Sequence, residues 1–503
     1  MSSTDRNRVL AIGLDAADPV LARRLVDAGE LPHLRALLGR GCWGEVQSLS
    51  ALGTTTVWPS FHTGQGAEAH GIYGDWVWNP ARMTVERDLG DRLVPFWKSL
   101  ALQGRTIGTL DVPYAPLSGL SGCSEIAAWG PYDWQGSQLR VSASRLAQIV
   151  AETTGPHPLA VRPPTIAGPH DLRGLTDLIA ACLDGIRKRG ALASRLIREH
   201  EHDLALIVFT ELHHASHPLW HTVEPDHPVF ATEELRSPPE IAGGLVAILR
   251  EVDRQVGEIV ANAGPETTVV VFSPHGMQPT RGLPNILDPL LRRLGFTVVK
   301  GWAAQSWPER GASGVRAVKR RVPQRLKDLY YRSLSRSLTY RIAQPAAPIP
   351  ICDWRRTRAV AVPIGQHGAI RLNLAGREAE GVLNLEEYRE TCRELRDLLQ
   401  SLRRHDGAPL VADVLCVAED LTGEPPAKLP DILVHWTDAA HVSPLRLEEP
   451  DVAATALAPR YTGKHSDQGF FIVCPSRPGA AQPPATIKVT ELHRMLEAAL
   501  AAP

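Results

Sequence analysis

The chain has 503 residues, and 44% of them are hydrophobic, which is enough to bury a substantial core. Because 54 Lys and Arg residues nearly cancel 55 Asp and Glu residues, the composition shows neither the basic excess typical of proteins that bind nucleic-acid polymers nor an acidic tail. The length suits one large α/β unit with insertions, or two to three smaller domains.

Buried strands alternate with helices along most of the chain. The apolar run Val9–Leu14 is predicted to be a buried strand, and Pro19–Leu38 has apolar residues at helical spacing. Alternation of this kind predicts a mostly parallel sheet with helices on both faces. Further strands are predicted at Arg105–Leu110, Leu204–Phe209, Thr268–Phe272, Ala359–Val362 and Ile432–Trp436, and further helices at Ser194–His200, Pro239–Ala263 and Val489–Leu500.

Two stretches have an irregular pattern. Residues from about 80 to 180 are rich in Pro, Gly and Trp, and residues from about 300 to 350 carry the basic run Val315–Lys327. We expect both to be insertions that cap the site of a single domain spanning residues 1–503.

The seven cysteines are odd in number and never spaced as CxxC, which disfavours a disulfide framework or a thiolate zinc site. The first apolar run is too short for a signal peptide, and no segment approaches the length of a membrane span. We therefore predict a cytoplasmic protein without membrane contact. The oligomeric state cannot be read from the sequence.

Two segments near the N-terminus carry oxygen ligands. Asp15 follows the first strand, where ligands of parallel sheets bind, and its carboxylate suits a metal cation. The alternative role for Asp15 is to cap the next helix. Thr54 opens a segment running to Gly64, and its hydroxyl can attack phosphorus when a metal lowers its pKa. A Ser/Thr-rich turn is the alternative there.

Histidines gather after the strand Leu204–Phe209. His213, His217 and His221 are spaced by four, so on one helix they would share a face. Pro218 disfavours helical backbone at His217, so we expect a loop there and a helix starting near Pro218. This density of histidines after a buried strand predicts metal binding.

Two further histidines, His275 and His465, each lie near glycine just outside an apolar run. Taken singly, each is a weak signal, because a turn would explain it equally well.

Taken together, these segments resemble the alkaline phosphatase superfamily, in particular its type I phosphodiesterase/nucleotide pyrophosphatase branch. The joint order and spacing carry the resemblance, which implies an α/β sandwich around a central sheet with two metals, usually zinc, at the carboxyl edge. The similar segments are Val9–Asp18, Leu31–Leu37, Thr54–Ile72, Phe209–His221, Val270–Met277, Asp353–Trp354, Arg371–Arg377, Pro430–Val434 and Gly463–Gly469.

The resemblance implies a role for each site residue. His217 and His465 would bind the first metal, and Asp15 and His275 the second. Thr54 would be the nucleophile, forming a phosphothreonine and touching the second metal.

Two positions depart from the family pattern. His213 stands where the family usually has aspartate, and Pro274 replaces the aspartate of an Asp-His-Gly sequence. His213, His217 and His465 would then form a three-histidine zinc site with a position open for water. The second site would keep only Asp15, His275 and the Thr54 oxygen.

We therefore expect one Zn²⁺ to bind tightly, with Mn²⁺ or Fe²⁺ as alternatives. The second metal is expected to be weak, absent, or completed by Asp18, Glu211 or Asp467. The loss of carboxylates favours a small anionic substrate.

The leading interpretation is a divergent phosphohydrolase or phosphodiesterase acting on a nucleotide or phosphorylated metabolite. Its nucleophile would be Thr54 or a metal-bound hydroxide. One alternative is a metalloenzyme of the same fold that catalyses phosphoryl transfer or another specialised biosynthetic reaction. Another is a catalytically inactive binding protein.

Overall fold

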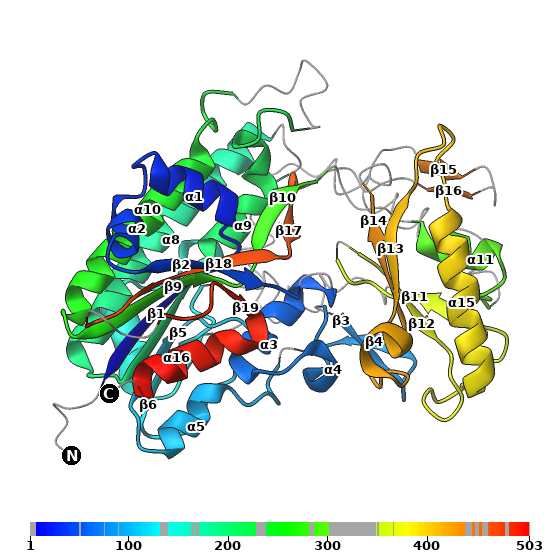
Figure 1. The fold of residues 1–503 in the computed structure, drawn as a ribbon, viewed down its shortest axis with the longest axis horizontal. Coiled ribbons are helices and arrows are strands. Elements are labelled where there is room, and N and C mark those ends of the chain that lie inside the picture. The colour runs from blue at the N-terminus through cyan, green and yellow to red at the C-terminus, as the bar shows by residue number, and fades with distance from the viewer. Residues whose placement is uncertain are drawn as a thin grey trace.

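The chain forms a larger and a smaller lobe, each built on its own sheet (Figure 1). In the part of the chain that the structure describes, no helix is both long enough and apolar enough to cross a membrane. The computed structural model describes residues 7–49, 52–74, 76–88, 90–130, 139–161, 166, 171–227, 238–280, 286–300, 349, 352–365, 367–437, 445–447, 452–454, 461–477 and 482–501.

The larger lobe contains a nine-stranded sheet in the order β19-β2-β18-β9-β1-β8-β5-β6-β7. The five central strands, from β9 to β6, are parallel to one another, which confirms the predicted sheet. Its strands are β1 (Arg8–Leu14), β2 (Cys42–Gln47), β5 (Ile107–Leu110), β6 (Cys123–Ala127), β7 (Arg140–Val141), β8 (Leu204–Phe209), β9 (Thr267–Ser273), β18 (Gln468–Cys474) and β19 (Thr486–Lys488).

Helices cover both faces of this sheet because its strands are apolar on both sides. In β1, Leu10 and Ile12 pack into one core and Val9 and Ala11 into another. The first core is covered by α1 (Pro19–Asp27), α2 (Pro32–Leu38), α6 (Ser144–Thr153), α7 (Pro158–Val161), α8 (Leu172–Glu199) and α10 (Gly244–Ala263), the second by α3 (Val57–Thr63), α5 (Phe96–Leu102) and α16 (Leu492–Ala501) (Figure 1).

Two predictions for the larger lobe are wrong in part. The helix predicted over Pro19–Leu38 is two helices, because Gly29 has a φ of 79° and Pro32 begins α2. The stretch 80–180 is not simply a cap, because β5, β6 and β7 belong to the main sheet and α6 packs beside them. Residues 301–348 of the second predicted cap lie outside the described residues.

The smaller lobe contains an antiparallel sheet in the order β11-β12-β14-β13. Two helices, α11 (Leu287–Arg293) and α15 (Leu385–Ser401), cover one face, and the hairpin of β3 (Trp76–Asn79) and β4 (Thr84–Arg87) packs on the other. The sheet strands are β11 (Ala359–Ala361), β12 (Gly368–Leu372), β13 (Val411–Cys416) and β14 (Ile432–Trp436), and β15 (Leu445–Leu447) pairs with β16 (Val452–Ala454).

Buried charges hold the smaller lobe together. Arg371 Nε donates to Glu378 Oε1 at 2.8 Å, and Arg377 donates to both oxygens of Asp431 at 2.6 and 2.8 Å. The Tyr388 hydroxyl donates to Asp431 Oδ1 at 2.8 Å. In this Arg–Asp cluster each guanidinium faces a carboxylate.

Candidate metal centre

Three neighbouring parallel strands bring candidate ligands to one edge of the main sheet. Asp15 follows β1, and His275 lies between β9 and β10 (Gly276–Pro279). His213 and His217 lie in α9 (Glu211–Leu219), which follows β8. His465 lies in β17 (Gly463–Ser466), which pairs with β10 so that Met277 faces His465.

The structure corrects the prediction of a loop at His217. Helix α9 runs through His217 and Pro218 to Leu219, so His213 and His217 share a face, with ring centroids 4.9 Å apart. Pro218 is tolerated because the helix ends one residue later, and its missing N–H affects only the final turn.

Asp15 is fully buried and contacted on both carboxylate oxygens. Trp58 Nε1 donates to Oδ1 at 2.8 Å, and His275 Nε2 lies 3.1 Å from the same oxygen. His213 Nδ1 lies 3.1 Å from Oδ2. Burial alone would raise the pKa of Asp15, but the imidazoles of His213 and His275 outweigh burial and hold this pKa well below its usual range.

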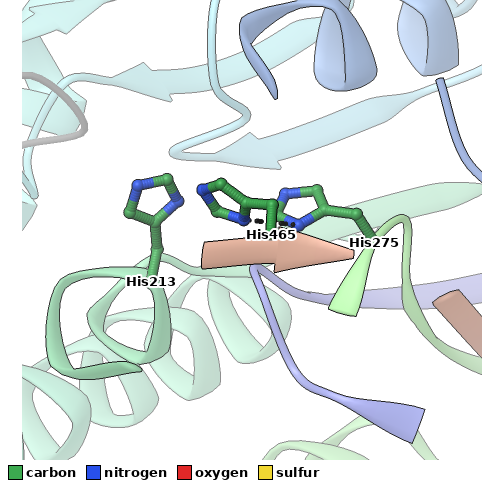
Figure 2. Close-up of side chains that lie close together, drawn as sticks. All are labelled: His213, His275 and His465. Atoms are coloured by element: carbon green, nitrogen blue, oxygen red, sulfur yellow. Dashed lines mark hydrogen bonds between the residues drawn. The ribbon is translucent and has the colours of Figure 1, made fainter. Parts of the chain in front are cut away.

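The other histidines form a chain of contacts that leads from Asp15. His465 Nδ1 lies 3.0 Å from His275 Nδ1, and His465 Nε2 lies 3.1 Å from His217 Nε2. His217 Nδ1 donates to the Gly463 carbonyl oxygen at 2.9 Å, since a carbonyl can only accept. Figure 2 shows His213, His275 and His465 converging, with the contact between His465 and His275 dashed.

This chain of contacts needs one positive charge more than neutral histidines provide. The four contacts run from the Gly463 carbonyl to His217, from His217 to His465, from His465 to His275, and from His275 to Asp15. Each contact needs one proton to be a hydrogen bond, whereas the three imidazoles, when neutral, carry only one proton each. A fourth proton is disfavoured at two rings. Burial and repulsion from His213 lower the pKa of His217 to about 3, and burial and repulsion from His275 lower that of His465 well below its usual value.

A metal cation fits this charge requirement. Two imidazole nitrogens bound to one tetrahedral zinc lie about 3.3 Å apart, given Zn–N bonds of 2.0–2.1 Å. The His217 and His465 Nε2 atoms, at 3.1 Å, are close to that separation. The residues present therefore suit a borderline cation such as Zn²⁺.

A further grouping of three histidines also comes close enough to share one cation. His213, His275 and His465 each place one ligand atom within 4.8 Å of the others. The expected set had His217 in place of His275. Thr54 begins the 3-10 turn η3 (Thr54–Thr56), directly before the helix that carries Trp58, and its side chain lies outside the described part of the structure.

The three carboxylates suggested to complete a second site have other surroundings. Glu211 accepts from Arg189 Nε at 3.0 and 3.1 Å and lies 2.8 Å from His157 Nε2. Burial raises the pKa of Glu211, but Arg189 and His157 outweigh this and lower it to about 2. Asp18 caps α1, accepting from Leu21 N at 2.8 Å, and Asp467 is exposed between β17 and β18.

Sequence reasoning missed two residues beside the ligands. Trp58 lies inside the Thr54–Gly64 segment, but nothing in that segment shows that an indole contacts Asp15. Thr462 directly precedes the Gly463 segment and contacts His221, which points to Thr462 Oγ1 through its Nδ1 at 3.0 Å. The one sequence feature that could have pointed to Thr462 is that it is a polar residue directly beside a predicted ligand segment.

Comparison with known proteins identifies related chains. The sequence model of the family described as type I phosphodiesterase / nucleotide pyrophosphatase matches residues 9–410. Comparison with curated protein sequences finds no match.

Among solved structures, the fold is similar to phosphonoacetate hydrolase from Sinorhizobium meliloti 1021. Its complex with phosphonoacetate has 14% identity and a TM-score of 0.55, with 99% of this chain and 96% of that chain covered. Its complex with phosphonoformate has 14% identity and a TM-score of 0.53 over the same shares. Human ectonucleotide pyrophosphatase / phosphodiesterase 5 is 12% identical, with a TM-score of 0.47 and the same coverage.

Proposed function

The chain belongs to the type I phosphodiesterase/nucleotide pyrophosphatase family, and we propose that it is a metal-dependent hydrolase of a small phosphorylated anion. The substrate would be a phosphodiester, pyrophosphate or phosphomonoester. A cytoplasmic location is part of this proposal and is supported by the seven cysteines, none of which forms a disulfide in the described part of the chain.

One observation carries the proposal. Four histidines and a buried aspartate converge at the carboxyl edge of the sheet, and their contacts call for an additional positive charge. A cation held there would attract an anionic substrate to a place where parallel α/β sheets bind ligands.

The protein's own residues would organise the reaction. Bound metal would supply charge neutralisation at the phosphate oxygens and lower the pKa of a coordinated hydroxyl. Trp58 donates to Asp15, whose carboxylate oxygens lie 3.1 Å from the rings of His213 and His275. The Gly463 carbonyl accepts the Nδ1 proton of His217, so that the Nε2 lone pair of His217 is available.

Thr54 is the proposed nucleophile. Its hydroxyl would lose its proton and form a bond to phosphorus as the bond from phosphorus to the leaving oxygen breaks, and the leaving oxygen would take up a proton. Water would then cleave the phosphothreonine and release the phosphoryl group, which regenerates the hydroxyl.

The experiment combines metal analysis with turnover. Dialysed protein would be analysed for metal and assayed with bis-p-nitrophenyl phosphate, p-nitrophenyl phosphate, a nucleoside triphosphate and phosphonoacetate. Thr54→Ala is expected to lower kcat by about a thousandfold or more, with Thr54→Ser retaining part of the activity.

Three outcomes would contradict parts of the proposal. Full activity of Thr54→Ala would exclude the threonine nucleophile. Two tightly held metals per chain would contradict the expectation of a weak second site. Protein that holds metal but turns over none of these substrates would support the binding-protein alternative.

A further inference from the structure

Thr462 stands between the end of α9 and the strand that carries His465. In an uninterrupted α-helix, the N–H of His221 would donate to the carbonyl of His217. Here Thr462 N donates to that carbonyl at 2.7 Å, and His221 N donates to Thr462 Oγ1 at 3.2 Å. Thr462 is fully buried, and it satisfies both groups that the helix leaves open.

The carbonyl of Thr462 joins two further segments to this point. It accepts from His227 Nε2 at 2.7 Å and from Thr280 N at 2.8 Å. Thr280 directly follows β10, the strand that begins one residue after His275. One buried residue therefore connects the segments that carry His217, His275 and His465.

Gly463 allows this close approach. A Cβ atom at this position would lie 2.6 Å from the Ser216 carbonyl oxygen, 2.8 Å from Met277 Cε and 2.9 Å from Trp220 Cβ. The Gly463 carbonyl also accepts from His217 Nδ1. A larger residue would separate β17 from α9, and with it His465 from His217.

We propose that Thr462 and Gly463 are positioning residues, which set the separation of His217 from His465 and through it the metal affinity of the centre. This inference rests on the proposed function, because it requires that these histidines hold metal. Neither residue would touch the metal. They would act as the outer partners that orient metal-binding imidazoles.

Thr462→Val tests this inference because it removes only the hydroxyl and keeps the backbone N–H. Zn²⁺ and Co²⁺ would be titrated into metal-free protein by calorimetry, and the visible spectrum of the Co²⁺ form recorded. We expect the dissociation constant to rise about 10- to 100-fold, with a changed Co²⁺ spectrum. Thr462→Ser is expected to restore both.

A matched control is available in the smaller lobe. Thr357 is also fully buried, and its Oγ1 accepts from Val298 N at 3.1 Å and donates to Val298 O at 3.2 Å. Thr357→Val is expected to lower the unfolding temperature and leave metal affinity unchanged. If Thr462→Val does not fold, His227→Phe removes one donor to the Thr462 carbonyl, and weaker metal binding is again expected.

The outcomes separate the two proposals. Wild-type affinity and an unchanged Co²⁺ spectrum in the folded Thr462→Val variant, or in His227→Phe if Thr462→Val does not fold, would overturn the inference alone. Failure of the wild-type protein to bind either metal would overturn the proposed function and the inference with it.

Discussion

The two lobes contain buried charged clusters of opposite character. In the Arg–Asp cluster of the smaller lobe, Arg371 faces Glu378 and Arg377 faces Asp431. In the histidine centre of the larger lobe, one carboxylate, Asp15, lies among imidazoles whose contacts need an extra positive charge. Both clusters are largely buried, but only the first is complete without a ligand.

The difference separates structural from functional use of buried charge. Pairing with carboxylates and hydrogen bonds keeps buried guanidiniums in place, and removing one partner leaves an uncompensated charge. Neutral histidines crowded together instead make a site that a cation completes. Buried titratable groups without a sufficient set of partners are a general mark of functional sites.

The largest expected effect is on the free energy of unfolding, when the Arg–Asp cluster of the smaller lobe is changed. Asp431→Asn would remove one of the two carboxylates that pair with Arg377, the other being Glu378, and would leave one buried positive charge uncompensated, so the free energy of unfolding should fall by about 3–5 kcal/mol. Urea unfolding measures this change. Metal content of the folded protein should stay at the wild-type level, and a parallel loss of metal would mean that the clusters are coupled.

In the histidine centre, removing one residue should weaken metal binding without lowering the stability of the metal-free protein. His465→Ala is expected to weaken Zn²⁺ binding by about 3 kcal/mol, a share of the binding energy of a four-ligand zinc site. The metal-free variant should unfold at the wild-type temperature or above, because a buried ring crowded by other imidazoles has been removed. Calorimetry and thermal unfolding of metal-free protein measure the two effects, and a large drop in unfolding temperature would contradict the comparison.

His70 is a buried histidine whose two ring nitrogens both have partners when the ring is neutral. Its Nδ1 accepts from Ile72 N at 3.1 Å, and its Nε2 lies 2.9 Å from Ser60 Oγ. Burial, together with the nearby Arg92, lowers the pKa of His70 to about 4.

The pH dependence follows from that lowered pKa. The unfolded chain takes up a proton near its ordinary pKa of 6.5, before the folded protein does. The stability contributed by neutral His70 is therefore lost as pH falls from about 6.5 to about 4, with a slope of up to about 1.4 kcal/mol per pH unit. His70→Asn should flatten this slope in urea unfolding between pH 7 and pH 4, and an unchanged slope would rule out His70 as its source.

The smallest effect is expected at exposed charges. Arg23 and Asp27 form an ion pair at 3.0 Å on the surface of α1. Because water screens this pair, Arg23→Gln should change the free energy of unfolding by less than about 0.5 kcal/mol. If Arg23→Gln lowered the free energy of unfolding as much as Asp431→Asn, burial would not explain why the Arg377–Asp431 pair contributes more than a surface pair.

The sheet could be predicted from the sequence because its central strands are buried on both faces. Continuous apolar runs such as Val9–Leu14 and Leu204–Phe209 have strand length and end in polar residues, so β1 and β8 were predicted nearly in full. The break after α1 was missed because the apolar spacing continues across Gly29 and Pro32. Apolar spacing predicts which face of a helix is buried, but it does not show where the chain turns and a new helix begins.

The site was harder to predict because its contacts cross long stretches of chain. The family pattern identified Asp15, His275 and His465, which the fold brings together. Glu211 was a candidate metal ligand because the sequence does not show its contacts with Arg189 and His157, which are distant along the chain. The helix through His217 was missed because Thr462, which satisfies its end, lies 245 positions further on.

The position of the smaller lobe gives the histidine centre a further consequence. His275 and His465 are separated by 190 positions, and every element of the smaller lobe from α11 to β16 lies between them. A metal held by both rings would cross-link the two ends of this long segment, in addition to the β10–β17 and β9–β18 pairings that already hold those ends together. A protease cut within this segment would then leave two fragments that the metal joins as well as the strand pairings.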